Sequence, residues 1–218
     1  MIFVNFKTHK EATGPKAVEL IQKINKCQAK ARLPVVPAVQ IADARLCVNT
    51  SLYDIWVQHV DSIEPGQNTG WILPEAVAAQ GVVGTFLNHS EHKYSNFSDL
   101  KKAIERCKSV GLYIMVFAKD LKELEEIVAL KPNFVALEPP ELIASQNTSV
   151  AKAKPDIIEK ASKIAKKSGV PLIVGAGVKD STDVKTSLKL GAAGVAVSSA
   201  VVLAKNPDEV LMELAKGF

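Results

Sequence analysis

Residues 172–197, LIVGAGVKDSTDVKTSLKLGAAGVAV, contain a strand, a helix and a second strand in immediate succession. Leu172–Gly175 and Gly194–Val197 are continuous apolar runs, which are typical of strands buried on both faces of a parallel sheet. Between them, Asp180–Leu190 has the amphipathic pattern of a helix, and Gly191 stands where that helix would end. The segment therefore predicts one parallel strand–helix–strand unit.

The same alternation continues through the rest of the chain. Further strands are expected at Ile2–Phe6, Val35–Val39, Asp54–Val60, Val82–Asn88, Leu112–Ala118 and Phe134–Glu138. Further helices are expected at Lys16–Lys30, Ser98–Val110, Asp120–Leu130, Pro155–Lys167 and Pro207–Lys216. Eight strands alternating with helices in 218 residues predict an α/β protein, a single (β/α)8 TIM barrel domain over residues 1–218. A doubly wound open sheet is the alternative, but no glycine-rich fingerprint follows the first strand.

The composition argues against several classes of partner. The 27 basic and 23 acidic residues give a net charge of only +4, which is too mild and too evenly spread to indicate nucleic-acid binding. No stretch approaches the roughly 18 apolar residues of a membrane span, and the first residues favour a strand over a signal peptide. Cys27, Cys47 and Cys107 lack metal-ligand spacing, so we expect reduced packing cysteines in a cytoplasmic protein.

Polar side chains stand at the carboxyl ends of three predicted strands. Asn5 and Lys7 follow the first strand, His89 the fourth and Glu138 the sixth. Because functional groups of barrels collect at this rim, we expect these residues to converge. Lys7 alone could be a solvated lysine and His89 a loop or capping histidine. Glu138 carries the stronger signal, since a carboxyl directly after an apolar strand is costly to bury unless it is paired or functional.

Two turns on the same rim suggest an anion site. The turn Gly175–Gly177 follows the seventh predicted strand, and Ser198-Ser199 follows the eighth. Barrels commonly bind phosphate at this position through backbone N–H groups. Ordinary turns are the alternative interpretation.

The ordered motifs resemble those of the archaeal triosephosphate isomerases. They are Asn5-Phe6-Lys7, Glu64–Gly70, Asn88–Glu91, Glu138–Ile143 and the glycine turn, and they occur in family order from one end of the chain to the other. Each motif is weak alone, whereas the ordered set is highly specific. The resemblance implies interconversion of dihydroxyacetone phosphate and D-glyceraldehyde 3-phosphate by proton transfer through an enediolate, in glycolysis and gluconeogenesis, without a metal or organic cofactor.

The resemblance also implies a role for each site residue. Glu138 would be the base, His89 the electrophile, and Asn5 and Lys7 would bind the substrate; a neutral histidine electrophile is the established pattern of the family. Ser90-Glu91 would begin a helix, which is compatible with a lowered pKa of His89, and Glu91 could pair with Lys7 or with a neighbouring cation. The implied substrate-binding positions are Ile143, Ala144, Gly175, Ala176, Gly177, Ser198 and Ser199.

The chain departs from the family at the implied lid, Pro139–Ala151. The lid tip reads Ile143-Ala144-Ser145-Gln146 where the family has Ile-Gly-Thr-Gly, and Ser198-Ser199-Ala200 replaces Ala-Ser-Gly after the eighth strand. Alanine keeps the backbone N–H donor, provided that positions 144 and 200 do not require a positive φ. We therefore expect altered lid kinetics and phosphate affinity, with the same proton-transfer chemistry.

The loop Gly66–Gly70 is expected to lie at an interface. It resembles the family loop that reaches into a neighbouring subunit, with Thr69 at its tip, and so implies a homodimer or homotetramer. An ordinary surface turn is the alternative.

Two other functions stay open at this point. Another phosphate-binding barrel enzyme would share the turns after the last two strands, but it is not expected to carry the Asn-x-Lys, His-Ser-Glu and Glu-Pro-Pro motifs together. A sugar-phosphate-binding barrel without catalysis would fit the altered lid tip.

Overall fold

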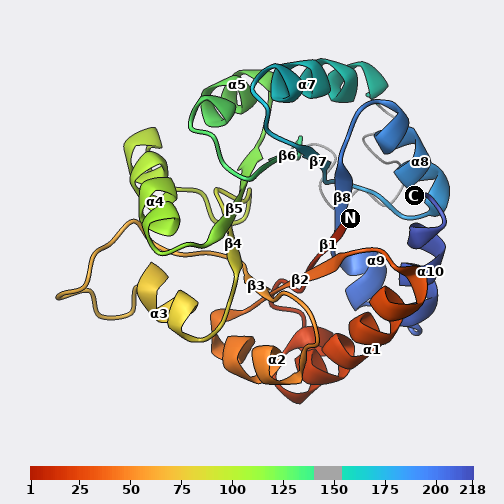
Figure 1. The fold of residues 1–218 in the computed structure, drawn as a ribbon, viewed down its shortest axis with the longest axis horizontal. Coiled ribbons are helices and arrows are strands. Elements are labelled where there is room, and N and C mark those ends of the chain that lie inside the picture. The colour runs from red at the N-terminus through yellow and green to blue at the C-terminus, as the bar shows by residue number, and fades with distance from the viewer. Residues whose placement is uncertain (140–153) are drawn as a thin grey trace.

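Eight parallel strands close into a barrel in a computed structural model that describes residues 1–139 and 154–218. Helices surround the barrel (Figure 1), and β1 pairs with β8 to close it, with Ile2 opposite Val195. The strands are β1 (Ile2–Asn5), β2 (Val35–Val39), β3 (Trp56–Val57), β4 (Gly84–Leu87), β5 (Tyr113–Ala118), β6 (Phe134–Leu137), β7 (Leu172–Val174) and β8 (Gly194–Val197). The predicted (β/α)8 barrel is confirmed, although β3 is much shorter than predicted.

Six helices lie within two residues of their predicted bounds. They are α1 (Pro15–Ala31), α4 (Phe97–Ser109), α5 (Leu121–Ala129), α7 (Pro155–Lys167), α8 (Ser181–Lys189) and α10 (Pro207–Ala215). The structure adds short elements that the pattern did not predict: α2 (Ala44–Thr50), α3 (Pro74–Ala79), α9 (Ser199–Val202), η1 (Lys10–Ala12) and η2 (Ile41–Asp43). An element of three to seven residues contains at most two helical turns, too few to show a periodic apolar stripe.

The strands are apolar throughout because both of their faces are buried. Alternate side chains point into the barrel, where Phe3, Trp56, Phe86 and Phe134 pack edge to face or tilted, with ring centroids 5.1 Å apart for Phe3 and Trp56. The ring of Trp56 fills the space beside Gly84, where an added Cβ would lie 2.3 Å from a ring atom. This aromatic cluster makes the barrel interior a packed core and leaves the carboxyl-end rim as the place for a cavity.

The other strand side chains point outward and pack under the helices. The helical stripe predicted for α4 is present, since Leu100, Ile104 and Cys107 are all buried. Cys27 and Cys47 are buried as well, and all three cysteines are free thiols, as predicted. Burial raises the pKa of Cys47 and of Cys107 to about 12, so both stay thiols at neutral pH.

Within residues 1–139 and 154–218, no helix combines the length and the apolar character needed to cross a bilayer.

Candidate active site

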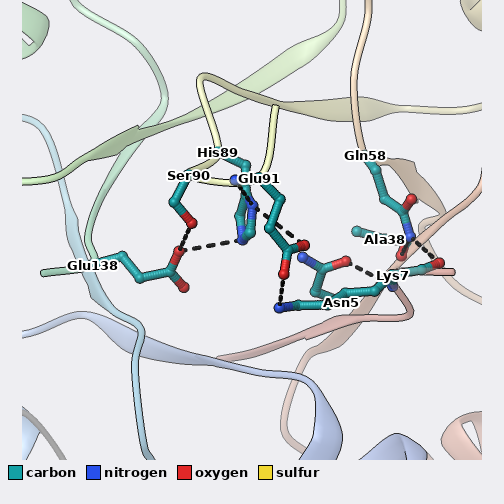
Figure 2. Close-up of polar contacts among 8 residues, drawn as sticks. All are labelled: Asn5, Lys7, Ala38, Gln58, His89, Ser90, Glu91 and Glu138. Atoms are coloured by element: carbon teal, nitrogen blue, oxygen red, sulfur yellow. Dashed lines mark hydrogen bonds and ion pairs between the residues drawn. The ribbon is translucent and has the colours of Figure 1, made fainter. Parts of the chain in front are cut away.

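One cavity of about 490 Å³ lies at the carboxyl ends of the strands. It brings together Asn5 and Lys7 from the end of β1, His89 from the end of β4 and Glu138 from the end of β6. Figure 2 shows the side chains of Lys7, His89 and Glu138 directed toward a common space. His89 and Glu138 lie 82 and 131 positions after Lys7 in the sequence, and they meet it here because every parallel strand ends at this rim.

Glu138 presents a buried carboxyl group to this cavity. Its side chain is 12% exposed, and its Oε2 lies 3.2 Å from His89 Nε2 and 3.4 Å from Ser90 Oγ, which donates to it. Burial raises the pKa of Glu138 from 4.5 to about 7, against the opposing effects of the Lys7 charge and the Ser90 hydrogen bond. A carboxyl that titrates near neutral pH is suited to accept and return a proton.

The absence of a side chain at Gly175 leaves space for the Glu138 carboxyl group. An added Cβ at position 175 would lie 2.9 Å from Glu138 Oε1. The first glycine of the predicted anion turn therefore lies against the carboxyl group and does not line the cavity, whereas Ala176 and Gly177 do.

His89 directs a protonated ring nitrogen at the cavity. The backbone N–H of Glu91 donates to His89 Nδ1 at 3.2 Å, so the neutral ring carries its proton on Nε2, the atom that faces Glu138. The ring also packs edge-on against Phe117, with centroids 4.8 Å apart. Burial lowers the pKa of His89 to about 4, although Glu91 acts in the opposite direction. The imidazole is thus neutral at physiological pH.

The expected helix start at Ser90-Glu91 is wrong. Residues 89–92 form a tight turn in which the His92 N–H donates to the His89 carbonyl at 2.8 Å, and the next helix, α4, begins only at Phe97. The pKa of His89 is lowered by burial of the ring and not by a helix terminus.

Lys7 is held by its side chain and by its backbone. Its Nζ forms an ion pair with Glu91 Oε1 at 2.6 Å, which is one of the pairings that the sequence left open. Its backbone has a φ of 46°, a left-handed conformation that is uncommon outside glycine. The Lys7 N–H donates to Asn5 Oδ1 at 2.9 Å, and the Lys7 carbonyl accepts from Gln58 Nε2 at 2.9 Å. Gln58 also donates to the Ala38 carbonyl at 3.2 Å (Figure 2), so it ties the strained turn to β2.

Sequence reasoning missed Gln58. Its one signal was its place directly after β3, on the same rim as the other site residues. A single glutamine after a two-residue strand gave no pattern from which its contact with Lys7 could be inferred.

The part of the cavity that follows β7 and β8 contains the predicted anion turns. Ala176 and Gly177 have φ values of 71° and 76°, so the strained backbone of this turn includes an alanine. Ser198 and Ser199 line the same wall, and the Ser198 Oγ is buried without a hydrogen-bond partner in the described part of the chain. Ala200 lies inside α9 and does not have a positive φ, so alanine in place of the family's glycine causes no backbone strain at this position.

The lid-tip residues Ile143, Ala144 and Gln146 lie outside the described residues. Within the described ranges, no group of three or more His, Cys, Asp or Glu side chains is arranged to hold a metal ion.

A family model described as triosephosphate isomerase matches residues 1–216. The chain belongs to the triosephosphate isomerase family. It is 36% identical to the triosephosphate isomerase of Methanocaldococcus jannaschii, over 99% of each chain, and 37% identical to that of Thermoplasma volcanium, also over 99% of each chain. The triosephosphate isomerase of Methanopyrus kandleri is 37% identical over all of this chain and 97% of its own. The resemblance inferred from the motifs is therefore confirmed.

Proposed function

We propose that this member of the triosephosphate isomerase family interconverts dihydroxyacetone phosphate and D-glyceraldehyde 3-phosphate. The observation that carries the proposal is the convergence of a carboxyl with a pKa of about 7, a neutral imidazole N–H and a lysine on one cavity. A proton transfer next to a carbonyl needs a base, a polarising donor and a compensating charge.

In the proposed reaction, the Glu138 carboxylate removes a proton from C1 of dihydroxyacetone phosphate. The C1–H electron pair becomes the C1–C2 double bond, and the carbonyl π electrons move to O2, which gives the enediolate. The Nε2–H of His89 donates to the substrate oxygens, and the Lys7 ammonium group stabilises their negative charge. Glu138 then returns its proton to C2 while the O1 proton passes to O2, which leaves the aldehyde and restores the enzyme.

Glu91 holds the Lys7 ammonium group in place for the proposed reaction. Its ion pair with Lys7 directs the ammonium group along the cavity wall beside His89, and its backbone N–H selects the tautomer of His89. Asn5 accepts from the Lys7 backbone N–H and lines the cavity, which supports its role as a substrate ligand.

The substrate phosphate is assigned to the wall formed by Ala176, Gly177, Ser198 and Ser199, with Gly175 behind it against Glu138. Ala176 and Gly177 in this turn both have positive φ. Left-handed residues of this kind can direct successive backbone N–H groups toward a bound anion. Ile143 and Ala144 are proposed to complete the phosphate contacts from the lid, Pro139–Ala151. Ala144 and Gln146 would alter how fast the lid opens and closes, with the chemical step unchanged.

The experiment is a coupled isomerisation assay on D-glyceraldehyde 3-phosphate, with Glu138→Asp compared with the native chain. Shortening the side chain withdraws the base by about one carbon–carbon bond, so kcat should fall about 100-fold or more with little change in KM. Glu125→Asp, on the exposed face of α5, is the matched control. Undiminished turnover by Glu138→Asp would refute the assignment of the base. A native chain that binds the phosphate ester without turnover would instead support the non-catalytic barrel.

The proposed reaction places the protein in glycolysis and gluconeogenesis. Three free, buried cysteines fit the reducing cytoplasm in which these reactions occur.

A homo-oligomer is proposed through the loop Gly66–Gly70. The segment between β3 and α3, orange in Figure 1, projects from the barrel, and Thr69 and Trp71 within it are exposed. A second cavity of about 620 Å³ adjoins the active site and is lined by His9, His59, Gln40 and Glu91 among others, so it is a candidate receptor for the same loop of another subunit. Analytical ultracentrifugation of the native chain and Thr69→Arg tests this. A native dimer or tetramer that Thr69→Arg dissociates is expected, and a native monomer would contradict the proposal.

A further inference from the structure

We infer that Glu123, on the first turn of α5, is a positioning residue for His89. Its carboxylate binds both ends of the segment 88–93, which carries the imidazole into the cavity. Glu123 itself does not line that cavity. The expected effect on turnover rests on the proposed isomerase function, whereas the effect on the orientation of His89 does not.

Four hydrogen bonds converge on this one carboxylate. Oε1 accepts from Asn88 Nδ2 at 3.0 Å and from Lys93 Nζ at 2.9 Å. Oε2 accepts from Lys93 Nζ at 3.1 Å and from the Lys119 backbone N–H at 2.7 Å. Glu123 therefore connects the residue before His89, the residue after the 89–92 turn, and the backbone that leaves β5. Its side chain is 19% exposed, so these charge-assisted bonds are partly shielded from water.

Asn88 needs such an anchor because its backbone is strained. It has a φ of 59° immediately before His89, a conformation that disfavours residues with a Cβ. Asparagine tolerates this conformation better than most residues, and here its Nδ2 also donates to the Phe117 carbonyl at 3.0 Å. The ring of the same Phe117 packs edge-on against the His89 imidazole. A rotation at Asn88 would therefore tilt the imidazole relative to both Phe117 and Glu138.

The other end of the turn is fixed by Lys93. The turn closes on itself through the hydrogen bond from the His92 N–H to the His89 carbonyl, and Lys93 follows directly. The Lys93–Glu123 ion pair thus holds the closed turn from its C-terminal side. With Asn88 on the N-terminal side, the turn has little freedom to move as a unit. The 3.2 Å separation between His89 Nε2 and Glu138 Oε2 depends on that fixation.

Gln at position 123 would break the arrangement without changing the size of the side chain. An amide has one acceptor oxygen in place of two. Its NH2 group would face the Lys93 ammonium group and the Asn88 amide at the Oε1 position, or the Lys93 ammonium group and the Lys119 N–H at the Oε2 position. Glu123→Gln is therefore the test variant. Glu125→Gln removes the same charge from the exposed face of the same helix and is the matched control.

Kinetics give the first readout. For Glu123→Gln we expect kcat to fall about tenfold to hundredfold, with KM for D-glyceraldehyde 3-phosphate changed by less than about threefold, because a misplaced electrophile weakens the transition state more than substrate binding. Glu125→Gln should stay within about twofold of the native kcat, on the scale of ordinary surface substitutions. An unchanged kcat in Glu123→Gln, with only a lower melting temperature, would overturn the inference.

A double-mutant cycle tests whether Glu123 acts through Asn88. Glycine tolerates the positive φ at position 88 but lacks the side-chain amide, so Asn88→Gly removes the connection and keeps the backbone. If the connection is real, adding Glu123→Gln to Asn88→Gly should reduce kcat less than it does in the native chain. If each substitution reduces kcat by the same factor in the double variant as it does alone, the two residues act independently and the inference is overturned.

The orientation of His89 can be measured without substrate by ¹⁵N NMR of the labelled histidines. The native protein should show neutral His89 with its proton on Nε2, and Glu123→Gln should shift the His89 ring signals while those of His9 stay in place. Unmoved His89 signals would overturn the inference. A native chain without isomerase activity would refute the proposed function alone, since the NMR comparison would still decide whether Glu123 positions His89.

Discussion

The buried carboxyl group of Glu138 predicts that the proposed base lowers the stability of the protein at the pH where it works. Glu138→Gln keeps the size of the side chain, and the amide oxygen can still accept from His89 and Ser90, but the negative charge is removed. The variant should lose isomerase activity and gain stability, and the gain should depend on pH.

The size of the gain follows from the pKa of Glu138. Because burial raises the pKa of the carboxyl in the folded protein from 4.5 to about 7, folding favours the protonated form. The stability linked to that proton is fully present below pH 4.5 and is lost as the pH rises to about 7. The difference between the two pKa values corresponds to about 3 kcal/mol. Glutamine resembles the protonated acid, so Glu138→Gln should be about 3 kcal/mol more stable than the native chain at pH 8, and less than about 1 kcal/mol more stable at pH 5.

Urea denaturation at pH 5, 6, 7 and 8 measures this difference, with Glu125→Gln as a control for the loss of an exposed charge. The free energy of unfolding of the control should follow that of the native chain at every pH. A Glu138→Gln gain of equal size at pH 5 and pH 8 would refute the reasoning. So would a loss of stability at pH 8, since it would mean that Lys7 and Ser90 stabilise the carboxylate more than burial destabilises it.

Three further predictions concern the same site and the core beneath it. Gly175→Ala should reduce kcat about tenfold or more with a small change in the free energy of unfolding, because the new Cβ would displace the flexible Glu138 carboxyl group. The coupled assay and urea denaturation measure these two effects, and an unchanged kcat would contradict the prediction. Gly84→Ala should destabilise the protein by about 2 kcal/mol or more, since its Cβ would overlap the immobile ring of Trp56, and a calorimetric melting temperature equal to that of the native protein would contradict the described packing. The kcat/KM of the native enzyme should fall as the pH drops below about 7, where Glu138 of the substrate-free enzyme becomes protonated. Titration of His89 should cause no further change in kcat/KM above pH 5. A profile that is flat from pH 8 to pH 5 would contradict the pKa of Glu138.

The fold could be predicted because its pattern repeats along the chain. Strands buried on both faces appear as apolar runs, and long helices show apolar stripes, so both signals are local and strong. The short helices α2, α3 and α9 escaped prediction because an element of one or two turns has no measurable period. Their positions are set by the connections between strands and by packing against the barrel.

The site was predictable in part, by position and by resemblance. Lys7, His89 and Glu138 follow predicted strands, and the closed parallel topology brings all strand ends to one rim. The supporting residues Gln58 and Glu123 were not predictable, because each acts through a long-range hydrogen bond to a strained backbone segment far away in the sequence.

The sequence by itself determined the barrel, the order of its strands and the family, since these depend on local apolar patterns and on ordered motifs. Only the tertiary structure decided the chemical state of the site. The sequence predicted a helix start beside His89 that would be compatible with a lowered pKa, whereas the folded chain has a tight turn there and lowers the pKa by burial. The pKa of Glu138 likewise depends on how completely Gly175, His89 and the surrounding strands exclude water from its carboxyl group. Solvent exclusion is a property of packed surfaces from distant segments, and therefore exists only once the barrel has closed.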